Sequence, residues 1–129
     1  MKLIDIIKAV KTLNSRAHER VPTALAYKMM KFVKASENDG TFFNAKFADI
    51  VERYAERDEN GQVTTNENGI VIAKDRLDDC QKCITELEGV EVNDPGIWFN
   101  LNELSELKLS MAELFTLDKF ITEEAEHGG

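Results

Sequence analysis

The chain has 129 residues, 43% of them hydrophobic, and a formal net charge of −8. These values predict one folded domain over residues 1–129 and argue against wholesale disorder. The negative charge disfavours direct nucleic-acid binding and adhesion to an anionic membrane. No apolar run reaches the roughly 20 residues that span a bilayer. Because Asp5, Lys8 and Lys11 interrupt the first apolar stretch, we expect no signal peptide.

The charge is divided unevenly along the chain. Residues 1–36 carry eight basic and two acidic side chains, whereas residues 37–129 carry eight basic and twenty-two acidic ones. The first segment therefore has a net charge of +6 and the second a net charge of −14. The second segment ends in an acidic tail over residues 123–129. This asymmetry favours binding to a partner over turnover of a substrate.

Helical periodicity dominates the N-terminal half. Apolar residues from Leu3 to Leu13 recur every three or four positions and predict an amphipathic helix over residues 2–14. Pro22 suits the first turn of a second helix, where its missing N–H would be unpaired in any case.

A third helix is expected after the segment Asn38-Asp39-Gly40, whose residue types commonly end a helix and form a turn. Thr41 can cap this helix, which should run to about Arg57 and close a helical part over residues 2–57. The second and third helices should then form an antiparallel αα-hairpin. We expect their apolar stripes to share one core, made of Leu25, Met29, Phe32, Phe43, Phe47 and Ile50.

In the C-terminal half, short β-type segments alternate with helical ones. Residues 62–73 place β-branched runs around a Gly-ended turn and predict a short β-hairpin. The helical period returns over residues 75–88. Residues 90–122 should hold short strands and C-terminal helices, the last opened by a capping box of Ser110 and Glu113. The predicted fold class is mainly α with a small β element (α+β).

Cys80 and Cys83 form the only named motif, a CxxC pair. Asp78 and Asp79 precede it, and their charge would raise a thiol pKa rather than lower it. A zinc site needs further ligands, and neither histidine stands at the required spacing. We therefore assign both cysteines to packing and expect no catalytic residue, no metal site and no cofactor.

Two charged helix faces are candidate partner-binding surfaces. The first is acidic and carries Asp75, Asp78, Asp79 and Glu86. It is either a solvated face or a mimic of nucleic-acid phosphates that occupies a basic groove on a partner. The second is the lysine side of the second helix, with Tyr27, Lys28, Lys31 and Lys34. It is either solvated or able to grip phosphate or an acidic protein.

Trp98 and Phe99 are the third candidate. Strand alternation should turn one of these side chains inward and the other outward. An outward aromatic ring would be a binding anchor, whereas two covered rings would simply belong to the core.

Three segments carry a resemblance to known proteins: residues 22–28, the turn Asp58-Glu59-Asn60-Gly61, and residues 104–114 continued through Phe120 and Ile121. In this order they resemble small proteins of tailed bacteriophages and prophages that have no settled function and are often encoded near virion structural genes. The resemblance implies a phage origin and a non-enzymatic role, and it carries over no catalytic residue.

The leading hypothesis is a phage-encoded protein–protein interaction module with an accessory, minor structural or assembly role. It would act in the cytoplasm of the infected bacterium or in the virion. The alternative is an acidic inhibitor of a host nucleic-acid-binding or defence protein, working by nucleic-acid mimicry. Either hypothesis expects a phage or host protein as partner and no membrane, and leaves the possibility of a homo-oligomer open.

Overall fold

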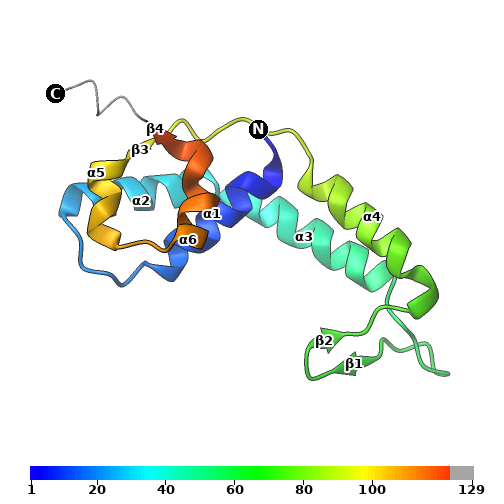
Figure 1. The fold of residues 1–129 in the computed structure, drawn as a ribbon. Helices are drawn as coiled ribbons and strands as arrows, with labels where there is room; N and C mark the ends of the chain where they lie inside the picture. Colours follow the sequence, from blue (N-terminus) through cyan, green and yellow to red (C-terminus); the bar gives the residue numbers. More distant parts are fainter. Residues whose placement is uncertain (123–129) are drawn as a thin grey trace.

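A computed structural model describes residues 1–122, so the predicted acidic tail lies outside the described residues (Figure 1). The α-helices are α1 (Leu3–Ser15), α2 (Thr23–Ala35), α3 (Glu37–Arg53), α4 (Leu77–Glu88), α5 (Leu101–Leu104) and α6 (Met111–Leu117). Single 3₁₀ turns are η1 (Lys74–Arg76), η2 (Ser105–Leu107) and η3 (Asp118–Phe120). The strands are β1 (Thr65–Asn66), β2 (Gly69–Ile70), β3 (Phe99–Asn100) and β4 (Ile121–Thr122). The prediction of a mainly α fold with a small β element is confirmed.

The molecule is elongated, with two parts that we call the lobe and the arm (Figure 1). The lobe contains α1, α2, α5, α6 and the β3–β4 pair. The arm contains α3 and α4, with the β1–β2 hairpin at its far end. Helix α1 contacts α2 and α6 in the lobe and α3 and α4 in the arm, so it joins the two parts.

An aromatic cluster forms the centre of the lobe. Phe32 of α2 is fully buried, and its ring centroid lies 5.9 Å from that of Phe99 and 4.8 Å from that of Phe120. The ring of Phe120 meets Phe32 edge to face, an arrangement that aromatic pairs favour. Apolar residues of α1, α2, α5, η2 and α6 surround the cluster: Ile6, Ala9, Leu13, Leu25, Met29, Leu104, Leu107 and Leu117.

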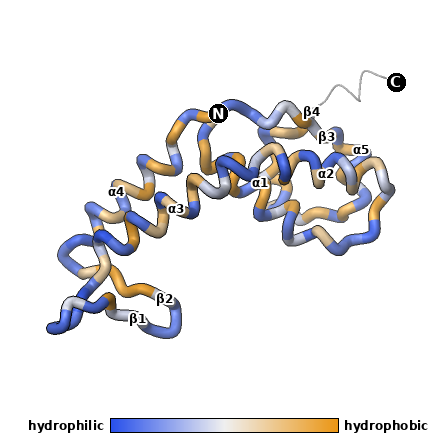
Figure 2. Tube along the Cα trace, turned by 180° about the vertical axis from the view of Figure 1, so that it is seen from behind, coloured by the Kyte–Doolittle hydropathy of each residue, from blue (hydrophilic) through white to orange (hydrophobic). Residues whose placement is uncertain are grey.

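A smaller core holds the arm together. Leu3 at the start of α1 packs with Phe43 and Ile50 of α3 and with Cys80 and Leu87 of α4. At the tip, isolated backbone bridges join Ala55 to Ile72 and Arg57 to Val63, beside the β1–β2 pair. Figure 2 shows a hydrophobic stretch that runs from β2 toward the arm, with a hydrophilic turn between β1 and β2. Both strands are exposed, and Val71 and Ile72, which follow β2, are half-buried. The predicted hairpin is confirmed. The helix predicted over residues 75–88 is also present, but it begins at Leu77, after the 3₁₀ turn η1.

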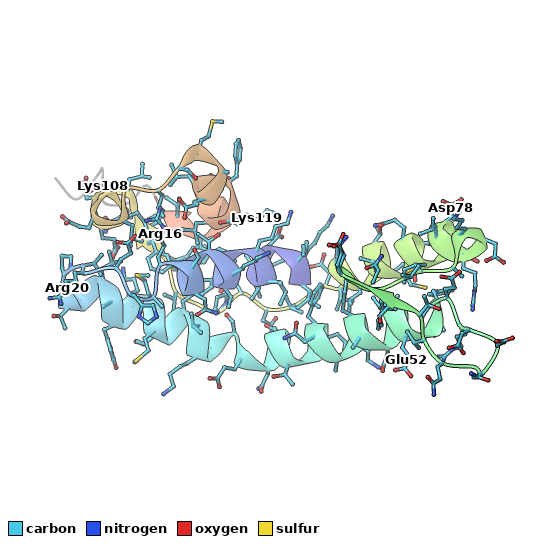
Figure 3. All side chains as sticks on the ribbon, turned by 90° about the horizontal axis from the view of Figure 1, so that it is seen from below. Arg16, Arg20, Glu52, Asp78, Lys108 and Lys119 are labelled. Atoms are coloured by element: carbon cyan, nitrogen blue, oxygen red, sulfur yellow. The ribbon has the colours of Figure 1, made fainter. Side chains whose placement is uncertain are left out.

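The predicted αα-hairpin of the second and third helices is wrong. Only Ser36 separates α2 from α3, which leaves no loop in which the chain could reverse. Figure 3 shows the two helices running end to end between the labelled Arg20 and Glu52. The Ser36 hydroxyl donates to the Phe32 carbonyl at 2.9 Å, a back-bond that bends helices without ending them in a turn.

The segment Asn38-Asp39-Gly40 is therefore the first part of α3 and not a turn. Glu37 and Asp39 lie in the first turn of that helix, where acidic side chains interact favourably with the helix dipole. The Gly40 N–H donates to the Ser36 carbonyl at 3.0 Å, so the helical pattern continues across the expected stop.

The expected common core of the second and third helices is likewise wrong. Leu25, Met29 and Phe32 belong to the lobe core, whereas Phe43 and Ile50 belong to the arm core. Phe47 is 38% exposed and stacks on Phe43 with ring centroids 5.8 Å apart. Because α2 and α3 run end to end, their apolar faces lie in different parts of the molecule. This explains why the two sets of apolar side chains do not share a core.

The segments before and after residues 93–96 pair with distant parts of the chain. Val92 donates its N–H to the Met1 carbonyl and Leu3 donates to the Val90 carbonyl, both at 2.8 Å. Strand β3 pairs in parallel with β4, with Phe99 opposite Ile121. The turn over residues 93–96 thus connects two separate pairings. The predicted capping box of Ser110 and Glu113 at the start of α6 is confirmed.

We predict that Phe32→Ala lowers the free energy of unfolding by about 3–5 kcal/mol, because it leaves a cavity between two aromatic rings. The matched truncation Phe47→Ala should cost less than about 1 kcal/mol, because solvent already reaches that side chain. Urea denaturation followed by circular dichroism measures both values. Equal costs for the two variants would contradict this division of the core.

Candidate interaction surfaces

Two predicted candidates meet in one surface groove of about 300 Å³. Tyr27, Lys28 and Lys31 come from α2, and Trp98 comes from the segment before β3. Ala24, Gly96 and Ile97 complete the lining. Residues far apart in the sequence therefore place two exposed aromatic side chains beside two lysines.

The position of Trp98 follows from its neighbours. The Asp94 carboxylate accepts the Gly96 N–H at 2.8 Å and shapes the turn, in which Gly96 adopts a φ of 73°. Phe99 is fully buried, whereas Trp98 is 43% exposed, as the alternation predicted. The ring centroid of Trp98 lies 6.4 Å from that of Phe120. Trp98 is therefore an outward aromatic side chain held by a rigid core.

The lysines of α2 are in different surroundings. Lys28 Nζ lies 2.8 Å from the Glu103 carboxylate, so its charge is already paired inside the lobe. Lys31 Nζ lies 5.5 Å from the Tyr27 ring centroid, a cation–π distance, and has no ion pair within residues 1–122. Lys34 lines a different hollow and is not part of the groove.

The acidic candidates lie elsewhere. Asp75, Asp78, Asp79 and Glu86 are exposed on η1 and α4, in the arm. Figure 3 shows Asp78 at the far end of the arm, away from Arg16, Arg20 and Lys108 in the lobe. The structure thus separates the acidic candidates from the aromatic and basic ones.

A second apolar surface was missed by the sequence analysis. Met111 and Phe115 are 74% and 73% exposed on α6, and with Leu101 they line a hollow of about 260 Å³. Leu114, Asp118 and Ile121 complete it. The signal was present, because Met111 and Phe115 stand four positions apart on the face opposite the buried Leu117.

A third hollow, of about 250 Å³, lies between the end of α1 and α2. Its lining is mostly apolar and includes Leu13, Val21, Met29, Met30 and Val33. Arg16 and Glu19 stand at its border, joined by an ion pair at 2.6 Å.

Helix α6 is fixed to α1 by a two-pronged ion pair. Arg16 Nε and Nη2 donate to the two Glu113 carboxylate oxygens at 2.8 and 2.7 Å. The side-chain hydrogen bond from Arg16 and the backbone N–H of Ser110 lower the pKa of Glu113 from 4.5 to about 2. The folded protein therefore holds Glu113 ionised under conditions that protonate an ordinary carboxyl group.

This shift predicts an acid-sensitive contribution to stability. Because the folded pKa of Glu113 lies below its unfolded pKa, the contribution is complete above about pH 4.5 and is lost as the pH falls toward 2. Thermal unfolding of wild type and Glu113→Gln across this range measures it. The variant should be less stable at neutral pH, and the difference should shrink with acidification. A difference independent of pH would contradict the assignment.

The cysteines belong to the arm core. Cys80 is buried, and desolvation together with the neighbouring Cys83 raises the pKa of its thiol. Cys83 Sγ lies 3.3 Å from the Tyr54 hydroxyl. A buried thiol with a raised pKa is a poor nucleophile, so the geometry agrees with a packing role.

We predict that Cys80→Ser lowers the free energy of unfolding by about 1–3 kcal/mol, because a hydroxyl replaces an apolar thiol in the core. Cys80→Ala should cost less, and Cys83→Ser less again because that side chain is partly exposed. Partner binding by the folded Cys80→Ala/Cys83→Ala protein should equal that of wild type. Loss of binding with an unchanged circular dichroism spectrum would show that the thiols have a functional role.

Within residues 1–122, no group of three or more His, Cys, Asp or Glu side chains is arranged to hold a metal ion. No helix in this part of the chain is long and apolar enough to cross a membrane. Comparison with protein-family models, curated proteins and solved structures gave no match.

Proposed function

We propose that this chain is a non-enzymatic protein–protein interaction module of a bacteriophage or prophage, with an accessory or assembly role. The observation that carries the proposal is the groove in which Tyr27 and Trp98 stand exposed beside Lys31. Exposed aromatic side chains held by a rigid core are typical anchors of protein interfaces. The phage origin, and a location in the infected cell or in the particle, rest on the sequence resemblance alone.

The partner expected at this groove is an acidic protein. Helix α2 carries three lysines and no acidic residue, and Lys31 has no carboxylate partner within residues 1–122. A volume of about 300 Å³ is at the lower limit of small-molecule sites and suits one or two anchoring side chains. Acidic residues around that anchor would be attracted by Lys31 and speed the encounter.

The arm supports a second candidate function, inhibition of a nucleic-acid-binding protein by mimicry. Residues 37–88 carry thirteen acidic and six basic side chains, a net of −7, and the four acidic candidates are exposed. However, Lys74, Arg76 and Lys82 lie among them. A row of phosphates has no such interruptions, so we rank mimicry second.

The test compares proteins captured from bacterial and phage-infected lysates by wild type and three variants. Tyr27→Ala/Trp98→Ala removes the groove walls. Phe42→Ala is the matched control, because Phe42 is also 43% exposed but lies on α3. Asp75→Lys/Asp78→Lys/Asp79→Lys reverses the arm charge. Circular dichroism verifies that each variant is folded.

We expect the groove variant to weaken binding of a specific partner by about 2 kcal/mol or more, roughly 30-fold, and the control to leave it unchanged. Loss of binding only in the arm variant, together with competition by DNA or RNA, would establish mimicry instead. Equal capture by wild type and all variants would refute both candidate surfaces.

A further inference from the structure

We propose that the hollow beside α6 is a self-association surface, where a second copy of this chain binds about a two-fold axis. This inference is independent of the groove and of the partner proposed for it. It begins from Leu101, Met111 and Phe115, large apolar side chains that are each about half exposed or more around one hollow. Contiguous exposed apolar side chains of this kind mark interaction sites.

The shape of the surface suits a copy of itself. A two-fold interface uses the same patch on both molecules, so the patch must present both a projection and a recess to receive it. Phe115 is the projection, with 73% of its surface exposed, and the hollow of about 260 Å³ that it borders is the recess. Each Phe115 would enter the hollow of the other copy.

The charges at the two ends of α6 are also self-complementary. Lys108 precedes the helix, Asp118 follows it, and neither forms an ion pair within residues 1–122. Asp118 lines the hollow and stands at the helix C-terminus, where the dipole disfavours a negative charge. A two-fold axis perpendicular to α6 makes the two copies of this helix antiparallel. Lys108 of each copy then faces Asp118 of the other.

The chain's own C-terminal segment is a poor alternative occupant. Residues 123–129 read Glu-Glu-Ala-Glu-His-Gly-Gly and contain no large apolar side chain that could fill the hollow. The patch itself is small, since six residues line the hollow and three of them come from the seven-residue helix α6. Small interfaces form weak complexes, so we expect a dimer that dissociates on dilution.

Sedimentation equilibrium of the full chain from about 1 µM to about 1 mM tests the proposal, a range that brackets weak association. Wild type should shift from monomer to dimer, and Phe115→Asp and Met111→Asp should each raise the dissociation constant at least about 30-fold. Phe42→Asp, at an exposed aromatic position on α3, is the matched control and should dimerise normally. A wild type that stays monomeric would overturn the proposal, as would unchanged dimerisation of Phe115→Asp.

Exchanging the two charges tests the antiparallel arrangement. Lys108 has a positive φ of 52°, which aspartate tolerates better than most residues, so Lys108→Asp is the suitable substitution. Lys108→Asp and Asp118→Lys should each weaken the dimer severalfold at low salt, and the double variant should restore it. Failure of the double variant to recover would refute the two-fold geometry.

Discussion

The buried ring of Phe32 is the contact on which the lobe depends. It touches Phe99 in β3 and Phe120 before β4, and so connects α2 with the C-terminal part of the chain. Trp98 adjoins Phe99, and its ring also rests on Phe120. Because Tyr27 lies on the same helix as Phe32, one aromatic cluster fixes both walls of the groove. The exposed surface is therefore a consequence of the core packing beneath it.

The division of charge along the sequence has a partly structural explanation. Arg16 pairs with Glu113, Lys28 with Glu103 and the N-terminal amine with Glu91, so acidic residues near the C-terminus neutralise the basic N-terminal segment. Residues 1–36 and 89–122 together carry a net of only +2, whereas residues 37–88 carry −7. In the folded protein the lobe therefore has a net charge close to zero, whereas the arm is acidic. A charged partner would interact differently with these two parts.

Local pattern was enough to predict the first helix, the β-hairpin, the capping box of α6 and the opposite orientations of Trp98 and Phe99. It failed at residues 36–40, because Asn, Asp and Gly occur in turns while acidic residues also suit a first helical turn. Helix α1 packs against both α2 and α3, and this packing decides between a turn and a continued helix at residues 36–40. Such a tertiary contact cannot be predicted from the local sequence. The groove was unpredictable for the same reason, since Tyr27 and Trp98 meet only through tertiary contacts.

The two proposed surfaces complement each other energetically. Each hollow is small, about 300 Å³ in the groove and about 260 Å³ beside α6, so each has room for only one or two anchoring side chains. A dimer formed through α6 would carry two grooves. When a partner offers repeated sites, as an assembling particle does, the second contact becomes intramolecular and the combined affinity exceeds that of one groove by orders of magnitude. Weak self-association would then make binding depend on the local concentration of the chain, favouring engagement of assembled targets over free subunits.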